Sequence, residues 1–392
     1  MQGMENIAVL HTQVEVQGTC DQRFERVREV FRNNLDTGQD IGAAVAVFVD
    51  GESVVDLWGG YFDASYTRPF ERDTIVQCYS STKTVTALCA LALADRGELD
   101  LDAPVARYWP EFAAEGKAEV AVKQLLGHTS GLCAWAEPLT LAGLCDVEKS
   151  TALLARQAPL WKPGRTSGYH GLTQGHLVGE VIRRVTGKSL GTFLREDVAG
   201  PLGVADVYYI GTPAAADHRM SPLVQGAPQD HAIGNRFHDL ALHNPHPTPQ
   251  ATWTVEWRRA ELGAMNGHGN ARAIATLQSL VASGVVNGKR LMSDAGRARV
   301  LEQQSDGVDL VIGFPCKWGM GYSLELGFIP GVPAGARAGW WAGNGGSLSY
   351  VDLDARMAVG FTPNRWISGP HEQTRSRSLL RAAYESLRDA RS

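Results

Sequence analysis

The spacing of apolar residues predicts strands and helices near both ends of the chain. Residues 20–35 carry apolar side chains on one face of a helix. Residues 42–60 follow as two strands joined by Asp50 and Gly51, a pair typical of a tight hairpin turn. An amphipathic helix is predicted close to the C-terminus, over 375–390. Four segments before it show strand character and predict an antiparallel meander: 318–326, 337–343, 347–354 and 357–364.

Helical periodicity dominates the middle of the chain. The predicted helices there cover 84–95, 122–126, 171–187, 189–198 and 270–284. Asn270 is placed to cap the last of them, and the Pro- and His-rich segment 213–249 is expected to be a long surface loop. The simplest architecture is a sheet completed by both termini. We predict an α/β domain from residues 1–70 and 265–392, and an inserted, mainly helical domain from 71–264.

The segment "SSTKTVTALCALALADRG" combines a polar start with a helix built for burial. Ser80 and Lys83 are three residues apart and therefore share a helix face. A neighbouring amine whose pKa is lowered by burial can take the proton of a serine hydroxyl, which makes the serine a nucleophile. The alternative is a simple helix cap followed by a solvated lysine. The Gly-x-Ser-x-Gly pattern of α/β-hydrolases does not occur in the sequence.

Four more segments follow "SSTKTVTAL" in order: "KQLLGHTSGL", "YHGLTQGHLVGEVIRRVTGKSL", "NGHGNARAIATL" and "WAGNGGSLSYVD". Together they resemble the serine β-lactamase/penicillin-binding-protein superfamily, and within it the family VIII carboxylesterases, over about residues 20–385. The resemblance implies an α+β protein with a β-lactamase/transpeptidase-like fold, in which an antiparallel sheet is flanked by helices and a mainly helical domain is inserted. It also implies that Ser80 is the nucleophile and Lys83 its partner.

The resemblance further identifies Tyr169 as the tyrosine of the second motif. A tyrosine between two cations has a depressed pKa and can shuttle protons. The alternative is that Tyr169 is an aromatic residue of the core with no role in catalysis. Gly171 stands where lactamases have an asparagine that helps to hold a substrate amide. Trp341, Ala342 and Gly343 stand where they have Lys-Thr-Gly, so a cation that grips a substrate carboxylate is replaced by an apolar surface.

The same resemblance implies an oxyanion hole made by two backbone N–H groups, of Ser80 and Asn344. Gly343 would permit close approach of the backbone to the acyl group. Trp341 is expected to contact substrate, and Trp135 and Trp257 are assigned to the same pocket because they lie in or near the motif loops. His170 follows Tyr169 and is assigned to the pocket too, with a polar role behind the pocket wall as the alternative.

The remaining histidines suggest no metal site. His128 is better explained as a loop residue bonded to backbone than as a triad base. The histidines of the Pro-rich segment fit no common metal motif, and we expect them to be solvated or at the pocket rim: His231, His238, His243 and His246. We therefore predict neither a metal nor an organic cofactor.

Composition narrows the choice of partners and compartment. The 392 residues have a net charge of −5 and show no stripe of Lys and Arg, which argues against nucleic acid. No run of about 18 uncharged apolar residues predicts a membrane span. The N-terminus lacks the pattern of a secretory signal, and six cysteines without a CxxC pair fit free thiols. A cytoplasmic protein is expected, and its oligomeric state stays open.

These observations favour a serine carboxylesterase that hydrolyses small neutral esters through an acyl-enzyme. The alternatives are a β-lactamase or D-amino-acid peptidase, an acyltransferase that uses the same catalytic residues, and an inactive homologue that serves as a binding module.

Overall fold

A six-stranded antiparallel sheet joins the two ends of the chain. The computed structural model describes residues 15–225, 235–327, 331–333, 336–367 and 374–391. The strand order is β1-β3-β2-β14-β13-β12, so an N-terminal strand pairs with a C-terminal strand at the centre. The strands are β1 (Val16–Cys20), β2 (Gly42–Val49), β3 (Glu52–Gly60), β12 (Ala338–Ala342), β13 (Leu348–Asp352) and β14 (Met357–Pro363). The expectation of a sheet completed by both termini is confirmed.

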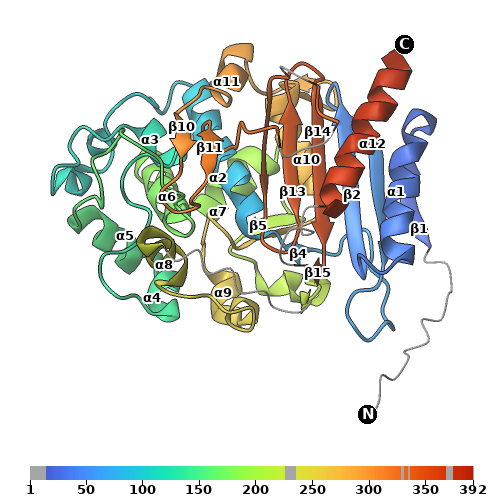
Figure 1. Cartoon of the computed structure of the whole chain (residues 1–392), viewed down its shortest axis with the longest axis horizontal. Helices are drawn as coiled ribbons and strands as arrows, with labels where there is room; N and C mark the ends of the chain where they lie inside the picture. The colour runs from blue at the N-terminus through green and yellow to red at the C-terminus, as the bar shows by residue number, and fades with distance from the viewer. Residues whose placement is uncertain (1–14, 226–234, 328–330, 334–335, 368–373, 392) are drawn as a thin grey trace.

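The central strand β2 buries both faces. Alternate residues along it pack into different clusters, Val45 and Val47 on one side and Ala46 and Phe48 on the other. The first cluster is covered by α1 (Glu25–Asp36) and α12 (Thr374–Arg391), which contact each other. The second is covered by α10 (Ala271–Ala282) and continues into α2 (Thr82–Asp95). The sheet is therefore sandwiched between helices, as Figure 1 shows.

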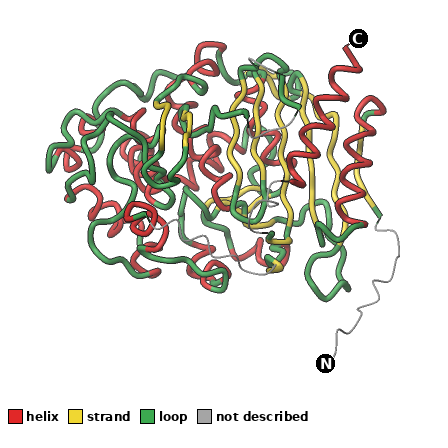
Figure 2. Tube along the Cα trace, viewed as in Figure 1, coloured by secondary structure: helices red, strands yellow, loops and turns green. Residues whose placement is uncertain are grey.

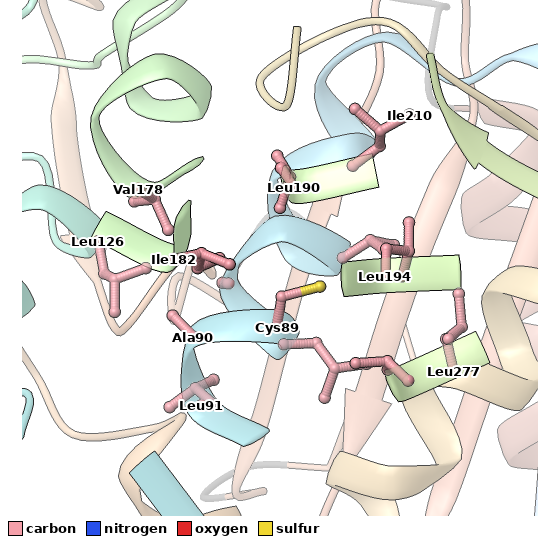
Figure 3. Packing of buried hydrophobic residues seen from close by; sticks show 14 of the residues in the cluster. Cys89, Ala90, Leu91, Leu126, Val178, Ile182, Leu190, Leu194, Ile210 and Leu277 are labelled. Atoms are coloured by element: carbon pink, nitrogen blue, oxygen red, sulfur yellow. The ribbon is translucent and has the colours of Figure 1, made fainter. Parts of the chain in front are cut away.

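The helix α2 runs through the larger hydrophobic core. Eleven of its fourteen residues are buried, which explains its nearly continuous apolar sequence. Figure 3 shows Cys89, Ala90 and Leu91 of α2 among side chains that come from several other elements. This core also takes in Leu177 of the predicted inserted domain and Ala275 of the predicted terminal domain. It is thus continuous across the proposed boundary at residue 265, and the division into two domains stays a prediction.

The region beside the sheet consists of shorter helices and loops, as Figure 2 shows. Its helices are α3 (Val122–Leu126), α4 (Leu141–Cys145), α5 (Val147–Arg156), α6 (Thr173–Thr186), α7 (Leu190–Phe193), α8 (Arg236–His243), α9 (Val255–Arg259) and α11 (Asp294–Arg299). The other described strands are short: β4 (Val76–Gln77), β5 (Tyr208–Ile210), β6 (Val224–Gln225), β7 (Gly267–Gly269), β8 (Val285–Val286), β9 (Lys289–Arg290), β10 (Ser305–Val308), β11 (Pro315–Trp318) and β15 (Arg365–Trp366). None of the described helices has the length and hydropathy needed to cross a bilayer.

Several local predictions are confirmed in detail. Asp50 and Gly51 both have positive φ, 54° and 86°, which is the conformation of the predicted hairpin turn. The side chain of Asn270 accepts a hydrogen bond from the N–H of Ala273 at 2.9 Å and so caps α10 as expected.

Two local predictions are wrong. The segment 318–326 does not form a continuous strand of the meander: β11, which ends at Trp318, pairs with β10, the chain then turns, and a single isolated bridge joins Ser323 to Trp340 of β12. Gly321 has a φ of 82°, and a Cβ there would lie 2.3 Å from Ala87 of α2; the turn is thus set by close packing on α2. The segment 213–249 is not one continuous loop, since it contains β6 and α8. His231, which lies in this segment, is outside the described residues.

Candidate active site

Ser80 lies in a single 3-10 turn (Tyr79–Ser81) that leads into α2. It is partly exposed, whereas its neighbours Tyr79 and Ser81 are buried. Tyr79 has a φ of 43°, an uncommon backbone conformation for a bulky residue. The hydroxyl of Ser81 points elsewhere and lies 2.9 Å from that of Ser347. Of these two adjacent serines, Ser80 is therefore the one with a hydroxyl that a ligand can reach.

Lys83 is buried beneath Ser80, with 1% of its surface exposed. Its Nζ donates hydrogen bonds to the carbonyl oxygens of Gly171 and Ala264, both at 2.8 Å, and lies 3.4 Å from Ser80 Oγ. Lys83 forms no ion pair with a carboxylate of any described residue. Burial lowers the pKa of Lys83 well below its usual value because the charged amine loses its hydration. The alternative of a solvated lysine is thus excluded.

Tyr169 places its hydroxyl 2.8 Å from Ser80 Oγ, to which it donates. The indole N–H of Trp341 donates to the same tyrosine oxygen at 3.1 Å. Burial raises the pKa of Tyr169 to about 12. The expectation of a depressed pKa is therefore wrong: the second cation of that argument is replaced by Trp341, and burial favours a neutral amine at Lys83 as well as a neutral phenol.

These contacts define the direction of a chain of hydrogen bonds. A neutral amine has two protons and one lone pair. Two carbonyl oxygens accept the two N–H groups of Lys83, which leaves the lone pair for its third polar neighbour, Ser80. Tyr169 accepts from Trp341 and donates to Ser80. In this neutral state of Lys83, the proton on Ser80 Oγ is directed towards the lone pair of the amine.

The loop between β12 and β13 faces the start of α2. A Cβ at Gly343 would lie 2.1 Å from the carbonyl oxygen of Cys78, so only glycine fits this approach. The hydroxyl of Ser347 donates to the same oxygen at 2.7 Å. Asn344 follows Gly343 at the exposed tip, and no described residue accepts a hydrogen bond from its backbone N–H. The expected role of this N–H in an oxyanion hole stays a prediction.

The same loop is held from the other side of the sheet by Arg375 of α12. Its Nη2 donates to the carbonyl oxygen of Gly345 at 2.7 Å, and its Nη1 donates to the carboxylate of Asp40. Arg375 and Asp40 are both almost fully buried. An ion pair buried in this way fixes geometry because breaking it leaves an uncompensated charge. The C-terminal helix thus positions the loop that carries Asn344.

Gly171 is packed against α8. A Cβ at this position would lie 2.5 Å from Leu242 Cδ2 and 3.5 Å from the carbonyl oxygen of Ala241. An asparagine side chain at residue 171 would therefore require the Leu242 side chain of α8 to shift. The segment expected to be a loop in fact supplies a helix that packs where an amide-binding side chain would extend.

Asp309 and Trp318 are functional residues that the sequence did not identify. Asp309 is fully buried, and its Oδ1 accepts hydrogen bonds from the backbone N–H groups of Tyr169, Val311 and Ile312 at 2.9–3.0 Å. Its Oδ2 accepts the indole N–H of Trp318 at 3.1 Å. The Trp318 ring stacks on Tyr169, with centroids 5.8 Å apart and planes 6° apart. Asp309 therefore fixes both the backbone and the ring of Tyr169.

His170 and His128 support the loop that carries Tyr169. The ring of His170 is fully buried, with Nε2 at 2.7 Å from Ser130 Oγ and Nδ1 at 2.6 Å from the carbonyl oxygen of Gly168. Its backbone N–H donates to His128 Nδ1 at 3.1 Å. Burial lowers the pKa of His170 to about 4. His170 is thus neutral near pH 7 and presents no exposed atom to a substrate.

Trp135 and Trp257 are not brought to Ser80 by any described contact. Both belong to the large hydrophobic core, and the indole N–H of Trp135 donates to the carbonyl oxygen of Ser150. Trp341, in contrast, packs against Trp318 and Tyr169, with centroid distances of 4.7 and 5.3 Å. Of the three tryptophans assigned to the pocket from the sequence, Trp341 is the one placed beside the serine, lysine and tyrosine.

The chain belongs to the Beta-lactamase family, whose model matches residues 27–384. It is 32% identical to the esterase/β-lactamase LipL of Mycobacterium tuberculosis over 369 residues, which cover 90% of this chain and 83% of LipL. It is 27% identical to esterase EstB of Burkholderia gladioli, with coverage of 88% and 92%.

Solved structures with a similar fold support the assignment of this chain to the family. A family VIII carboxylesterase superposes with a TM-score of 0.88 at 38% identity and covers 95% of this chain and 100% of its own. A penicillin-binding protein homologue from Caulobacter crescentus has a TM-score of 0.87 at 37% identity, with the same coverage. The predicted fold is confirmed, and the chain is a serine hydrolase of the esterase/β-lactamase type.

The role assigned to Asp309 can be tested with Asp309→Asn. Asparagine keeps one carbonyl oxygen for the three backbone N–H groups but sets an N–H₂ against the indole N–H of Trp318. We expect the free energy of unfolding to fall by about 1–3 kcal/mol and the turnover of a p-nitrophenyl ester to drop, both measured on purified protein. In a Trp318→Phe background the same change should cost less, because the opposed donor is gone. Strictly additive losses would contradict this role.

Proposed function

We propose that this chain hydrolyses small neutral esters through an acyl-enzyme formed on Ser80. The observation that carries the proposal is the set of contacts around Ser80 Oγ: Trp341 donates to Tyr169, Tyr169 donates to Ser80, and Lys83 Nζ lies 3.4 Å from the same oxygen. It combines a reachable hydroxyl with a buried amine whose lowered pKa lets it act as a base at a lower pH than an exposed lysine.

In the first step Ser80 Oγ attacks the ester carbonyl carbon while its proton passes to Lys83 Nζ. The negative charge that develops on the carbonyl oxygen is stabilised by the backbone N–H groups of Ser80 and Asn344. The intermediate then collapses, the bond between the carbonyl carbon and the alcohol oxygen breaks, and the alcohol leaves with the proton from Lys83. Tyr169 is placed to relay that proton, because its hydroxyl already lies 2.8 Å from Ser80 Oγ.

In the second step water attacks the acyl group on Ser80. Lys83 accepts a proton from the water, the acid is released, and the proton returns to Ser80 Oγ. An alcohol that replaced the water would make the chain an acyltransferase with the same residues. Nothing in the arrangement of these side chains calls for a metal or an organic cofactor in either step.

The preference for neutral esters rests on two features of the pocket wall. Trp341 offers one N–H, which is already donated to Tyr169, so it has no polar group left for a substrate carboxylate. A carboxylate against its ring would lose hydration without gaining a partner, whereas an apolar acyl or aryl group would gain about 25 cal/mol per Å² buried. In addition, α8 packs against Gly171 where an amide-binding side chain would extend.

The identity of the nucleophile can be tested by comparing Ser80→Ala with Ser81→Ala. Loss of a nucleophile removes several orders of magnitude in rate, so Ser80→Ala should abolish hydrolysis of p-nitrophenyl butyrate. Ser81→Ala is the matched control, since the Ser81 hydroxyl bonds to Ser347 rather than to Lys83 or Tyr169, and it should retain most activity. Mass spectrometry after fluorophosphonate labelling should find the adduct on Ser80. An adduct on another residue would refute the assignment.

The base role of Lys83 predicts the shape of the pH profile. The amine is active when neutral, and its pKa is lowered by burial, so kcat/KM should rise with pH and reach a plateau well below the pH at which an exposed lysine loses its proton. Tyr169, with a pKa of about 12, stays protonated across that plateau.

A matched variant for this profile is Lys83→Arg, which keeps N–H donors but cannot supply a lone pair. It should lose about 100-fold or more in turnover at every pH. If Lys83→Arg kept its activity, or if kcat/KM of the native chain did not fall at low pH, Lys83 would not be the base.

The substrate class can be tested by comparing kcat/KM for p-nitrophenyl acetate or butyrate with that for ring opening of a chromogenic cephalosporin. We expect the esters to be cleaved at least about tenfold faster, because an oriented carboxylate partner is missing at Trp341. Faster ring opening would show that this chain acts as a β-lactamase and that Trp341 does not set its specificity.

A further inference from the structure

Three potential metal ligands meet at α8 and belong to none of the contacts around Ser80. The ligand atoms of His238, Asp239 and His243 all lie within 4.8 Å of one another. Nδ1 of His238 is 3.6 Å from Asp239 Oδ1, and Nδ1 of His243 is 3.7 Å from the same oxygen. The carboxylate oxygen thus lies between two imidazole nitrogens.

His238 provides a second and independent observation. The surface of His238 is 8% exposed, and its buried Nδ1 has no hydrogen-bond partner among the described residues. A buried imidazole nitrogen without a partner is costly, and this one points towards the oxygen of Asp239. The side chains of Asp239 and His243 are 59% and 42% exposed. The cluster therefore has a buried inner ligand and an outer side that solvent can reach.

We propose that His238, Asp239 and His243 bind a divalent transition-metal ion such as zinc. Two imidazoles and a carboxylate are a typical zinc donor set. A tetrahedral ion with bonds of about 2.1 Å places neighbouring ligand atoms about 3.4 Å apart, close to the two distances already present. The fourth position is open to water or to His246, whose ring centroid lies 4.9 Å from that of His243.

The sequence alone disfavoured this site because the ligand spacing matches no common helical motif. Asp239 and His243 are four residues apart and share a helix face, whereas His238 approaches from the neighbouring face, inside the protein. A bound ion would tie the middle of α8 to its last residue. Because α8 packs on Gly171 through Ala241 and Leu242, the ion would also stiffen the wall beside the carbonyl that holds Lys83.

The test is calorimetric titration of the full chain, freed of metal with a chelator, with zinc chloride. We expect one saturable site of micromolar affinity or better in the native chain. His243→Ala and Asp239→Asn should each weaken binding at least tenfold, and both side chains are exposed enough for the variants to fold. His218→Ala is the matched control, because His218 is another exposed histidine outside the cluster, and it should bind zinc as the native chain does.

Thermal unfolding of the same four proteins gives a second measurement. Zinc should raise the midpoint of the native chain and of His218→Ala, since a ligand that binds only the folded state stabilises it. It should not raise the midpoint of His243→Ala or Asp239→Asn. The proposal is overturned if the native chain shows no saturable binding, or if the two cluster variants bind zinc as tightly as the control. Neither measurement depends on ester hydrolysis, so the outcome is independent of the proposed function.

Discussion

The amine of Lys83 donates hydrogen bonds to two backbone carbonyl oxygens, of Gly171 and Ala264, in a place that water does not reach. Burial favours the neutral amine, because the charged form would lose its hydration and no described carboxylate pairs with it. The remaining lone pair is then free for Ser80. The arrangement requires three separated segments to meet at one nitrogen: the start of α2, the turn before α6 and the chain that leads into β7.

The core keeps these segments in place. The helix α2 is buried on nearly all sides, so its first turn cannot tilt without disturbing contacts with α6, α10 and the sheet. Asp309 accepts four hydrogen bonds, of which one comes from the backbone of Tyr169 and one from the ring of Trp318. Buried polar groups of this kind are effective positioning devices when every member is satisfied. The site is therefore held by a rigid helix, α2, and by a buried carboxylate, Asp309, that fixes Tyr169 and Trp318 by hydrogen bonds.

In the proposed function, Trp341 contributes both to substrate choice and to catalysis. Its ring forms an apolar wall with Trp318, and its N–H fixes the tyrosine oxygen as the acceptor of one hydrogen bond and the donor of another. The same residue thus removes a cation from the pocket and still supplies a donor to Tyr169. Burial sets the direction of the pKa shift of Lys83 and is the largest cause of the upward shift of Tyr169, to which the carboxylate of Asp309 adds.

The sequence by itself determined the hairpin at Asp50, the cap at Asn270, the buried character of α2 and the grouping of Ser80, Lys83 and Tyr169, because these depend on local turn chemistry, periodicity and ordered motifs. It did not determine the path of residues 318–326, the helix at 236–243 or the role of Asp309. Those depend on contacts between distant segments: Gly321 against α2, Leu242 against Gly171, and one carboxylate shared by N–H groups of residues 169, 311, 312 and 318. The pKa of Tyr169 was misjudged for the same reason, since burial is a property of the folded chain.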